Sequence, residues 1–316
     1  MSTATVSRAL SRPEVVADST RTAVLEAVQR TGYRINATAS NLRRQRTGSV
    51  FALVPNLSNP FFSRILAGLT SVLTPAGYGL LVADTQTGPD PEARLQGYLT
   101  SGLADGLVLL DGALATQAEA TPGRPPVVMA CEWGTGALPS VRVDNAHGAQ
   151  LAVDHLADLG HRHIGHITGP RGNVLTETRL EGFRRATKAR GLEPPWMQGG
   201  DFTLASGAAA AQAWLDLPRR PTAVFAASDQ MAVGFMGALH RAGLSVPGDV
   251  SVVGFDNIDV AHHLTPGLTT VRQYRNQIGE QSAAMLLRLI ESGDDLCPSE
   301  IVPVEFIQRE STAPLR

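Results

Sequence analysis

From Ser49 onward, short apolar segments alternate with longer amphipathic ones, and this alternation constrains the fold more than any other feature of the chain. The short segments have the length and composition of buried strands, and the long ones have the period of helices. Up to residue 145 the expected strands are SVFALVP, YGLLVAD, GLVLLDG, PVVMACE and VRVDN, with helices at 61–75 and 92–102. Strands and helices that alternate in this way form parallel sheets with right-handed crossovers.

The same rhythm begins again after residue 145. Helices are expected at 147–160, 176–190, 205–216, 229–242 and 275–292, between the strands HIGHITG, QGGDF, TAVFAAS, SVVGFDN, LTTVRQ and a final EIVPVEFIQRES. A chain of 316 residues also exceeds the usual size of one hydrophobic core. We therefore predict an α/β body over 49–316, with two similar lobes of parallel sheets flanked by helices and a cleft between them. Lobe 1 is expected at about 49–145 plus 276–292, and lobe 2 at 146–275 plus 293–316.

The first 48 residues follow a different, purely helical pattern. Residues 2–11 form one short helix, and a second runs from a cap at Asp18 or Ser19 to Thr31, where Gly32 ends it. The first helix carries small polar residues opposite Val6, Ala9 and Leu10, which is typical of the second helix of a helix-turn-helix. We predict a partial helix-turn-helix headpiece at 1–35 and a short hinge helix with a linker at 36–48.

Charge separates this arm from the body. Residues 1–46 contain eight arginines and three acidic residues, whereas the whole chain has a net charge of −2. A basic arm on an acidic body indicates that the arm contacts phosphates and the body does not. An arginine-rich helix pair that only faces water is an equally good interpretation of charge alone.

Two further features concern location. The chain contains no run of about 18 apolar residues and no basic stretch followed by an apolar core, so neither a membrane span nor a secretory signal is expected. Cys131 and Cys297 are too few and too distant to form a disulfide framework. We expect a cytoplasmic protein in which Cys131 packs inside its strand.

Six motifs together resemble the LacI family of bacterial transcription regulators, also called LacI/GalR, and the resemblance covers essentially the whole chain. These motifs are STATVSRAL, NATASNL, NPFF, DHLADLGHRHI, RLEGF and VPGDVSVVGFDN. The resemblance implies a DNA-binding headpiece, a hinge, and a body similar to periplasmic sugar-binding proteins.

For the arm, the resemblance implies contacts with an operator. Short side chains in the recognition helix would approach base edges and phosphates, and Arg8 would bind phosphate. Leu42 matches the hinge leucine that the family inserts into the minor groove, although packing inside a helix pair is the simpler role for a leucine. The DNA-contacting residues implied are Ser2, Thr3, Ala4, Thr5, Ser7, Arg8, Asn36, Ala39, Leu42 and Arg43.

The resemblance also bears on the start of the chain. Relatives usually carry about a dozen residues before this point, including a first helix that packs under the recognition helix. Met1 stands where a valine is usual, and a GTG valine codon can initiate translation. We expect the translated protein to begin upstream, because Val6 and Leu10 otherwise lack a partner.

For the body, ligands of open parallel sheets bind at the carboxyl ends of strands. By resemblance, Phe61 and Phe62 stack on an effector, Arg179 and Asp256 hydrogen-bond it, and Phe202 closes from lobe 2. The effector-contacting residues predicted are Phe61, Phe62, Trp133, Asp144, Arg179, Phe202, Ser228, Asp229 and Asp256. Each has a structural alternative: a helix cap for Asp144, an ion pair for Arg179 and core packing for the phenylalanines.

The effector class follows from three positions of the same resemblance. Asn173 and Leu175 stand where purine-responsive members have arginine and threonine, and Ser228 stands where several sugar-responsive members have asparagine. A carboxylate, an arginine fork and aromatic faces suit a hydroxyl-rich ring. We therefore expect a sugar or sugar derivative as the effector, and no cofactor.

Two other patterns are weaker. His161, His163 and His166 are close in sequence, but they lie at a helix-to-strand turn, so we expect no zinc site. No nucleophile elbow, phosphate loop or spaced carboxylate pair is present, so we do not expect an enzyme.

These observations predict a ligand-responsive, sequence-specific DNA-binding regulator, which we expect to repress carbohydrate genes as a homodimer on a pseudo-palindromic operator. The alternative is a sugar-binding module or sensor that does not bind DNA because its headpiece is incomplete. Loss of operator binding even with upstream residues restored would favour the alternative.

Overall fold

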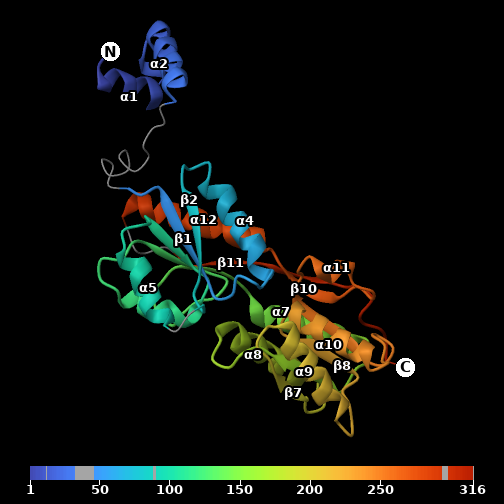
Figure 1. Ribbon diagram of the computed structural model, residues 1–316. Helices are drawn as coiled ribbons and strands as arrows, with labels where there is room; N and C mark the ends of the chain where they lie inside the picture. The colour runs from blue at the N-terminus through green and yellow to red at the C-terminus, as the bar shows by residue number, and fades with distance from the viewer. Residues whose placement is uncertain (12, 33–45, 88–89, 294–297, 316) are drawn as a thin grey trace. The chain divides into compact units, whose positions relative to one another are not determined.

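The structure is a computed structural model that describes residues 1–316 except 12, 33–45, 88–89, 294–297 and 316 (Figure 1). The chain divides into two compact units, Met1–Thr47 and Gly48–Arg316. Within the described residues, no helix is long and apolar enough to cross a membrane.

The first unit is a small helical headpiece. It contains α1 (Thr3–Ser11), the 3-10 turn η1 (Pro13–Val15) and α2 (Asp18–Thr31). Ala9 and Val24 are its buried core, so α2 packs against α1. Gly32 ends α2 in the left-handed conformation, as expected. The expected cap at Asp18 or Ser19 is wrong, because α2 already begins at Asp18 and Ala17 precedes it without a side-chain cap.

The first lobe of the body contains a parallel six-stranded sheet in the order β11-β5-β4-β3-β1-β2 (Figure 1). Its strands are β1 (Ser49–Val54), β2 (Gly79–Asp84), β3 (Gly106–Leu109), β4 (Val127–Ala130), β5 (Ser140–Val143) and β11 (Glu300–Val302). Val50, Ala52 and Val54 face a core with α4 (Phe61–Leu73) and α12 (Arg275–Ser292). Phe51 and Leu53 face the opposite core, with α5 (Pro91–Thr100), η2 (Gly112–Leu114) and α6 (Ala115–Ala120). Burial of both faces explains the continuous apolar runs of β1, β3 and β4, whereas the edge strand β2 is largely exposed.

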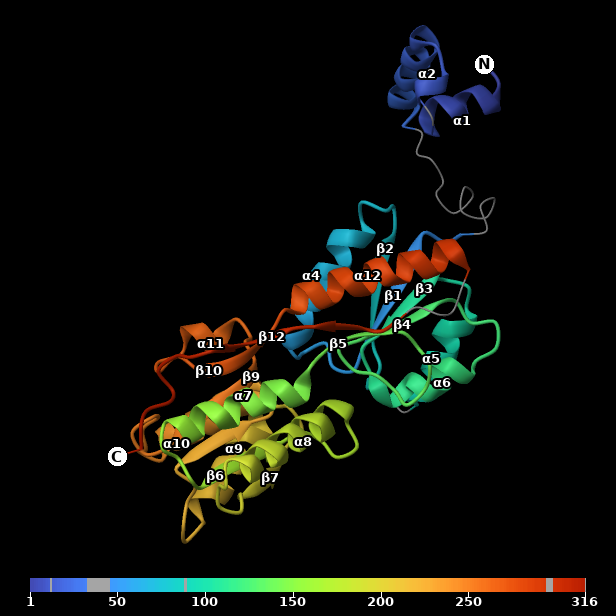
Figure 2. The same cartoon turned by 180° about the vertical axis from the view of Figure 1, so that it is seen from behind.

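The second lobe repeats this plan with a sheet in the order β12-β10-β9-β8-β6-β7 (Figure 2). Its strands are β6 (Ile164–Thr168), β7 (Met197–Gly199), β8 (Ala223–Ala226), β9 (Ser251–Asp256), β10 (Thr269–Gln273) and β12 (Val304–Ile307), of which β12 runs antiparallel to β10. One core lies under α7 (Asn145–Asp158) and α8 (Val174–Ala189). The other lies under α9 (Leu204–Leu215), α10 (Asp229–Arg241) and the short α11 (Val260–His263). The doubly wound, two-lobed fold class predicted from the alternation is thereby confirmed.

The expected final strand is two strands, one in each lobe. β11 pairs with β5 of the first sheet, and β12 pairs with β10 of the second. Pro303 separates them, and because proline has no N–H to donate, it ends the ladder where the chain crosses. Residues 300–302, which we assigned to lobe 2, therefore belong to lobe 1.

Helices α4 and α12 approach each other closely through glycine. A Cβ atom on Gly279 would lie 2.1 Å from the carbonyl oxygen of Ile65, and backbone cannot move aside easily. We predict that Gly279→Ala lowers the free energy of unfolding by about 1–3 kcal/mol, measured by urea denaturation. Gly97→Ala is the matched control, because a Cβ there meets nothing within 4 Å, and it should be neutral or slightly stabilising. Equal stabilities of the two variants would contradict this packing.

Candidate functional site

A pocket lies between the two lobes, at the carboxyl ends of strands from both sheets. Its lobe 1 residues follow β1 and β4, and its lobe 2 residues follow β7, β8 and β9 or lie in the first turns of α8. The lining residues are Asn59, Phe61, Phe62, Cys131, Glu132, Leu175, Arg179, Phe202, Ser228 and Asp256. Six of the nine predicted effector contacts are thus brought together: Phe61, Phe62, Arg179, Phe202, Ser228 and Asp256.

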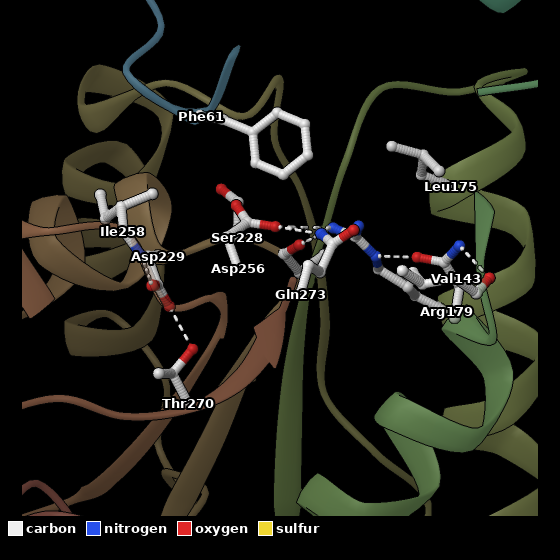
Figure 3. A network of polar contacts seen from close by, with 12 residues as sticks. Phe61, Val143, Leu175, Arg179, Ser228, Asp229, Asp256, Ile258, Thr270 and Gln273 are labelled. Atoms are coloured by element: carbon white, nitrogen blue, oxygen red, sulfur yellow. Dashed lines mark hydrogen bonds and ion pairs between the residues drawn. The ribbon is translucent and has the colours of Figure 1, made fainter. Parts of the chain in front are cut away.

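Arg179 is the central cation of this pocket (Figure 3). Its side chain is only 2% exposed, on the second turn of α8. Its Nε donates to Asn145 Oδ1 at 2.9 Å and its Nη1 to the carbonyl oxygen of Ala227 at 2.5 Å. The guanidinium carbon lies 3.9 Å from the ring centroid of Phe255. These contacts fix the guanidinium plane, while Nη2 is buried and donates no hydrogen bond within the described part of the chain.

Asp256 faces Arg179 from the end of β9. Its Oδ1 lies 3.8 Å from Arg179 Nη1 and accepts a hydrogen bond from Gln273 Nε2 at 2.7 Å. Burial raises the pKa of Asp256 to about 6, and Arg179 and Arg275 limit the increase. Asp256 has φ 120° and Asn257 has φ 54°, which is strained backbone for residues other than glycine. Strain of this kind is frequent where a side chain must be aimed at a site.

Aromatic side chains line the pocket from both lobes. Phe61 and Phe62 open α4, and their ring centroids lie 5.1 Å apart in an edge arrangement. Phe202 lies on the other lobe with φ 65°, and its ring centroid is 5.9 Å from the guanidinium carbon of Arg179. Ser228 caps α10 by accepting from Met231 N at 3.3 Å. The pocket therefore offers apolar faces around a small number of fixed polar groups, as ligand sites generally do.

Three predicted contacts do not line the pocket. Asp144 is an exposed helix cap, which accepts from His147 N at 2.9 Å, so the structural alternative holds for it. Trp133 stacks instead with Arg142, whose guanidinium carbon is 4.5 Å from the ring. At the turn that follows β4, the pocket is lined by Cys131 and Glu132 instead of Trp133.

Asp229, the third, is fully buried and lies on the side of Asp256 away from Arg179 (Figure 3). Its carboxylate accepts from Ile258 N at 2.8 Å and from Thr270 Oγ1 at 2.5 Å. Burial raises the pKa of Asp229 to about 8, and the neighbouring Asp256 carboxylate adds to the increase. Asp229 therefore holds the segment that follows β9 against β10 and does not line the pocket.

Sequence reasoning missed Glu132 and misplaced Cys131. Cys131 lies just beyond β4 with φ 61°, lines the pocket, and has a thiol pKa raised by burial. Glu132 accepts from Gly112 N at 2.7 Å and from Asn173 Nδ2, across the lobes, at 2.8 Å. Burial raises the pKa of Glu132 to about 7. The position of Glu132 directly after β4 was the available signal for a pocket residue, but the same signal favours Trp133, the effector contact predicted at this turn.

The buried carboxyls make stability depend on pH. Asp229 is protonated below a pKa of about 8 in the folded chain, and its ordinary pKa is 3.8. The unfolded chain therefore binds fewer protons, and the free energy of unfolding should fall as pH rises from about 4 to 8. We predict a fall between pH 6 and 8, at most about 1.4 kcal/mol per pH unit for one group, that Asp229→Asn reduces. Asp249→Asn, at an exposed turn, should leave the slope unchanged; a flat wild-type profile would contradict the assignment.

Two of the three closely spaced histidines, His161 and His166, have structural partners, whereas the buried Nδ1 of His163 has no hydrogen bond within the described residues. His161 Nδ1 pairs with Thr222 Oγ1 at 2.9 Å, and its Nε2 lies 3.1 Å from Ser251 Oγ. His166 stacks between Phe183 and Phe225 at centroid distances of 4.7 and 4.8 Å. Burial lowers the pKa of His166 to about 4, so it is neutral. No group of three or more metal-ligating residues occurs in the portion of the chain that is described.

The headpiece residues predicted to contact DNA are described only in part. Ser2 Oγ accepts from Thr5 N at 3.2 Å, which caps α1, and the exposed Arg8 donates from Nε to the carbonyl oxygen of Ala4 at 3.3 Å. Thr3 and Ser7 belong to α1. Asn36, Ala39, Leu42 and Arg43 lie outside the described residues.

Comparison with known proteins gives consistent matches over both units. Residues 1–36 match the family "bacterial regulatory proteins, lacI family", and residues 153–312 match the periplasmic binding protein-like domain. The HTH-type transcriptional repressor CytR of Escherichia coli (strain K12) is 37% identical, over 100% of this chain and 94% of that protein. PurR of Proteus mirabilis (strain HI4320), also a repressor, is 33% identical over 99% of this chain and 94% of that protein.

Solved structures give the same result. The lac repressor dimer bound to operator and an anti-inducer matches with a TM-score of 0.88 and 27% identity, over 98% of this chain and 95% of that one. A LacI family regulator from Enterococcus faecium with bound ribose matches with a TM-score of 0.78 and 30% identity, over 85% of this chain and 100% of that one.

These relatives are repressors and not enzymes, in agreement with the interpretation of the sequence. The family resemblance of the six motifs, the two-lobed fold and the matches over both units lead to one conclusion: the chain belongs to the LacI family of bacterial regulatory proteins.

Proposed function

We propose that this protein is a transcriptional repressor that binds operator DNA as a homodimer and responds to a carbohydrate bound in the interlobe pocket. The CytR and PurR relatives are repressors, and each aligns with nearly the whole chain. The basic arm supports phosphate contacts, since residues 1–46 contain eight arginines and three acidic residues.

One observation carries the ligand half of the proposal. Arg179 is buried between lobes with its Nη2 unpartnered within the described residues, beside the Asp256 carboxylate and among aromatic rings. A buried donor without a partner costs free energy, so the site gains stability when a ligand acceptor satisfies it. Neighbouring donor and acceptor groups with apolar faces suit vicinal hydroxyls on a ring.

Two relatives support the carbohydrate class. The Enterococcus faecium regulator was crystallised with ribose, and the regulator CelR, 32% identical over 96% of this chain, was crystallised with cellobiose. Glu132 and Asp256 are two acidic side chains against the single cation Arg179 among the lining residues, which disfavours an anionic ligand.

The proposed mechanism is a linkage between pocket and DNA. Ligand binding changes how the lobes meet, and this alters whether the hinge at 36–48, with Leu42, becomes ordered on the operator. Reciprocity requires the ligand and the operator to change each other's affinity by the same factor. The sign of the effect distinguishes an inducer from a corepressor.

Two measurements test the proposal. The protein, expressed from its chromosomal gene and purified, should enrich a pseudo-palindromic site from fragmented genomic DNA. Its thermal midpoint should rise with one member of a panel of neutral sugars, ribose and cellobiose included. Enrichment of no sequence would contradict the repressor, and stabilisation by no carbohydrate would contradict the ligand class.

A further inference from the structure

Two arginines tie the lobes together immediately outside the pocket. Arg64 lies on α4 of lobe 1, and its Nη2 is 2.9 Å from Asp259 Oδ2 of lobe 2. Arg275 is the first residue of α12, and its guanidinium reaches both lobes. Asp259 therefore receives Arg64 on one carboxylate oxygen and Arg275 on the other, the latter at 3.4 Å.

Arg275 forms the inner part of this connection. Its side chain is only 6% exposed, and its Nη1 donates to the carbonyl oxygens of Pro60 and Phe61, each at 3.3 Å. Its Nη2 donates to the carbonyl oxygen of Asn257 at 3.1 Å. One guanidinium thus joins the start of α4 to the loop that follows β9.

The segments joined in this way are those that carry the pocket. Phe61 and Phe62 are in the same first turn of α4 whose carbonyls bind Arg275, and Arg64 follows within one turn. Asp256 is the last residue of β9 and lies three residues before Asp259, and Asn257 between them accepts from Arg275 through its carbonyl oxygen. A shift of Asp259 relative to Arg64 therefore moves the carboxylate of Asp256 relative to the aromatic rings of Phe61 and Phe62, which form the aromatic wall of the pocket.

We propose that Arg64, Asp259 and Arg275 form an interlobe clamp that positions the Phe61–Phe62 wall against Asp256. They are positioning residues, because none of the three lines the pocket. The clamp rests on the proposed function only in that the pocket is taken as the ligand site. It sets the separation of the lobes in the free protein, and hence the shape that a ligand meets.

Arg64 and Arg275 contribute differently to the interlobe clamp. The side chains of Arg64 and Asp259 are 53% and 64% exposed and lie in an open groove, so water and salt screen their attraction. Arg275 is buried and holds backbone carbonyls, so salt affects it much less. The outer pair is therefore the adjustable part of the clamp, and its removal should not unfold either lobe.

Arg64→Ala tests the clamp, with Arg272→Ala as the matched control. Arg272 forms a comparable pair with Glu305 at 2.8 Å, with side chains 36% and 45% exposed, but both residues lie in lobe 2. Spin labels carried by an unnatural amino acid at the exposed Thr70 and His263 would report the separation of α4 and α11. The full chain is measured without DNA or sugar, diluted with unlabelled protein.

At 50 mM salt, Arg64→Ala should increase the fraction of long interlobe distances roughly two- to fivefold, and Arg64→Lys should restore the wild-type distribution. Raising the salt to 500 mM should increase the fraction of long interlobe distances in the wild type and in Arg272→Ala as much as Arg64→Ala does at 50 mM. The same salt should cause no further increase in Arg64→Ala, because the screened ion pair is already absent. Thermal midpoints should agree across the variants.

An Arg64→Ala distribution identical to the wild type, or an equal shift in Arg272→Ala, would overturn the clamp. Because no ligand or operator is present, these results do not depend on whether the pocket binds carbohydrate. Failure of the clamp and failure of the proposed function are therefore distinguishable.

Discussion

Replacing Arg179 with methionine is expected to abolish carbohydrate binding and to lower the free energy of unfolding by about 3–5 kcal/mol. The methionine fills much of the same volume but removes Arg179 as a countercharge of the buried Asp256 carboxylate, which leaves only the attraction of Arg275. It also removes the donors to Asn145 Oδ1 and the Ala227 carbonyl oxygen. Urea denaturation and titration calorimetry with the sugar identified in the panel would measure both effects.

Two further variants make this prediction specific. Arg190 lies at the surface end of the same helix, where it pairs with Asp154 and Asp158 at 2.7 Å each, and Arg190→Met should change stability far less than Arg179→Met because solvent screens these pairs. Adding Asp256→Asn to Arg179→Met should recover part of the lost stability, because the unpaired charge disappears. Equal costs of Arg179→Met and Arg190→Met would refute the central role of Arg179.

Operator affinity is expected to fall by about three orders of magnitude between 50 and 200 mM salt, which is the effect of roughly six phosphate contacts. In the proposed homodimer, two arms would supply these contacts from the arginines within residues 1–46 of each chain. Fluorescence anisotropy on the enriched operator would give the slope of log affinity against log salt.

Arg8→Gln should reduce that slope by about two for a dimer, one contact for each chain, with a similar loss on all sequences. Arg8 is exposed on α1, and its hydrogen bond to the Ala4 carbonyl oxygen leaves other donors free for phosphate. Arg219→Gln, on the surface of the body, serves as the control. A slope unchanged by Arg8→Gln would show that α1 does not face the DNA backbone.

Alternating periodicity predicted the two-lobed body because doubly covered parallel strands produce long apolar runs. Val50 to Val54 illustrates this, since even and odd residues enter separate cores. The pairing of the last strands was not predictable in the same way. Glu300–Val302 and Val304–Ile307 have similar composition, and only long-range pairing assigns them to different sheets.

Prediction of the pocket residues from the sequence has a comparable limit. The rule that ligands bind after strands, together with the family resemblance, pointed to Arg179, Asp256 and the three phenylalanines, all of which line the pocket. It did not distinguish neighbours such as Asp229 and Ser228, or Trp133 and Glu132, because that choice depends on local backbone angles. Cys131, for example, has a φ of 61° in the turn after β4, and the residue types around it do not predict this backbone angle.

The most direct test of the account is the operator dissociation constant with and without the stabilising sugar, paired with the sugar dissociation constant with and without operator. We predict that both change by the same factor, about 5- to 150-fold. Asp256→Asn should weaken sugar binding and leave the operator affinity of the sugar-free protein unchanged. A sugar that binds in the pocket while operator affinity stays constant would contradict a ligand-responsive repressor.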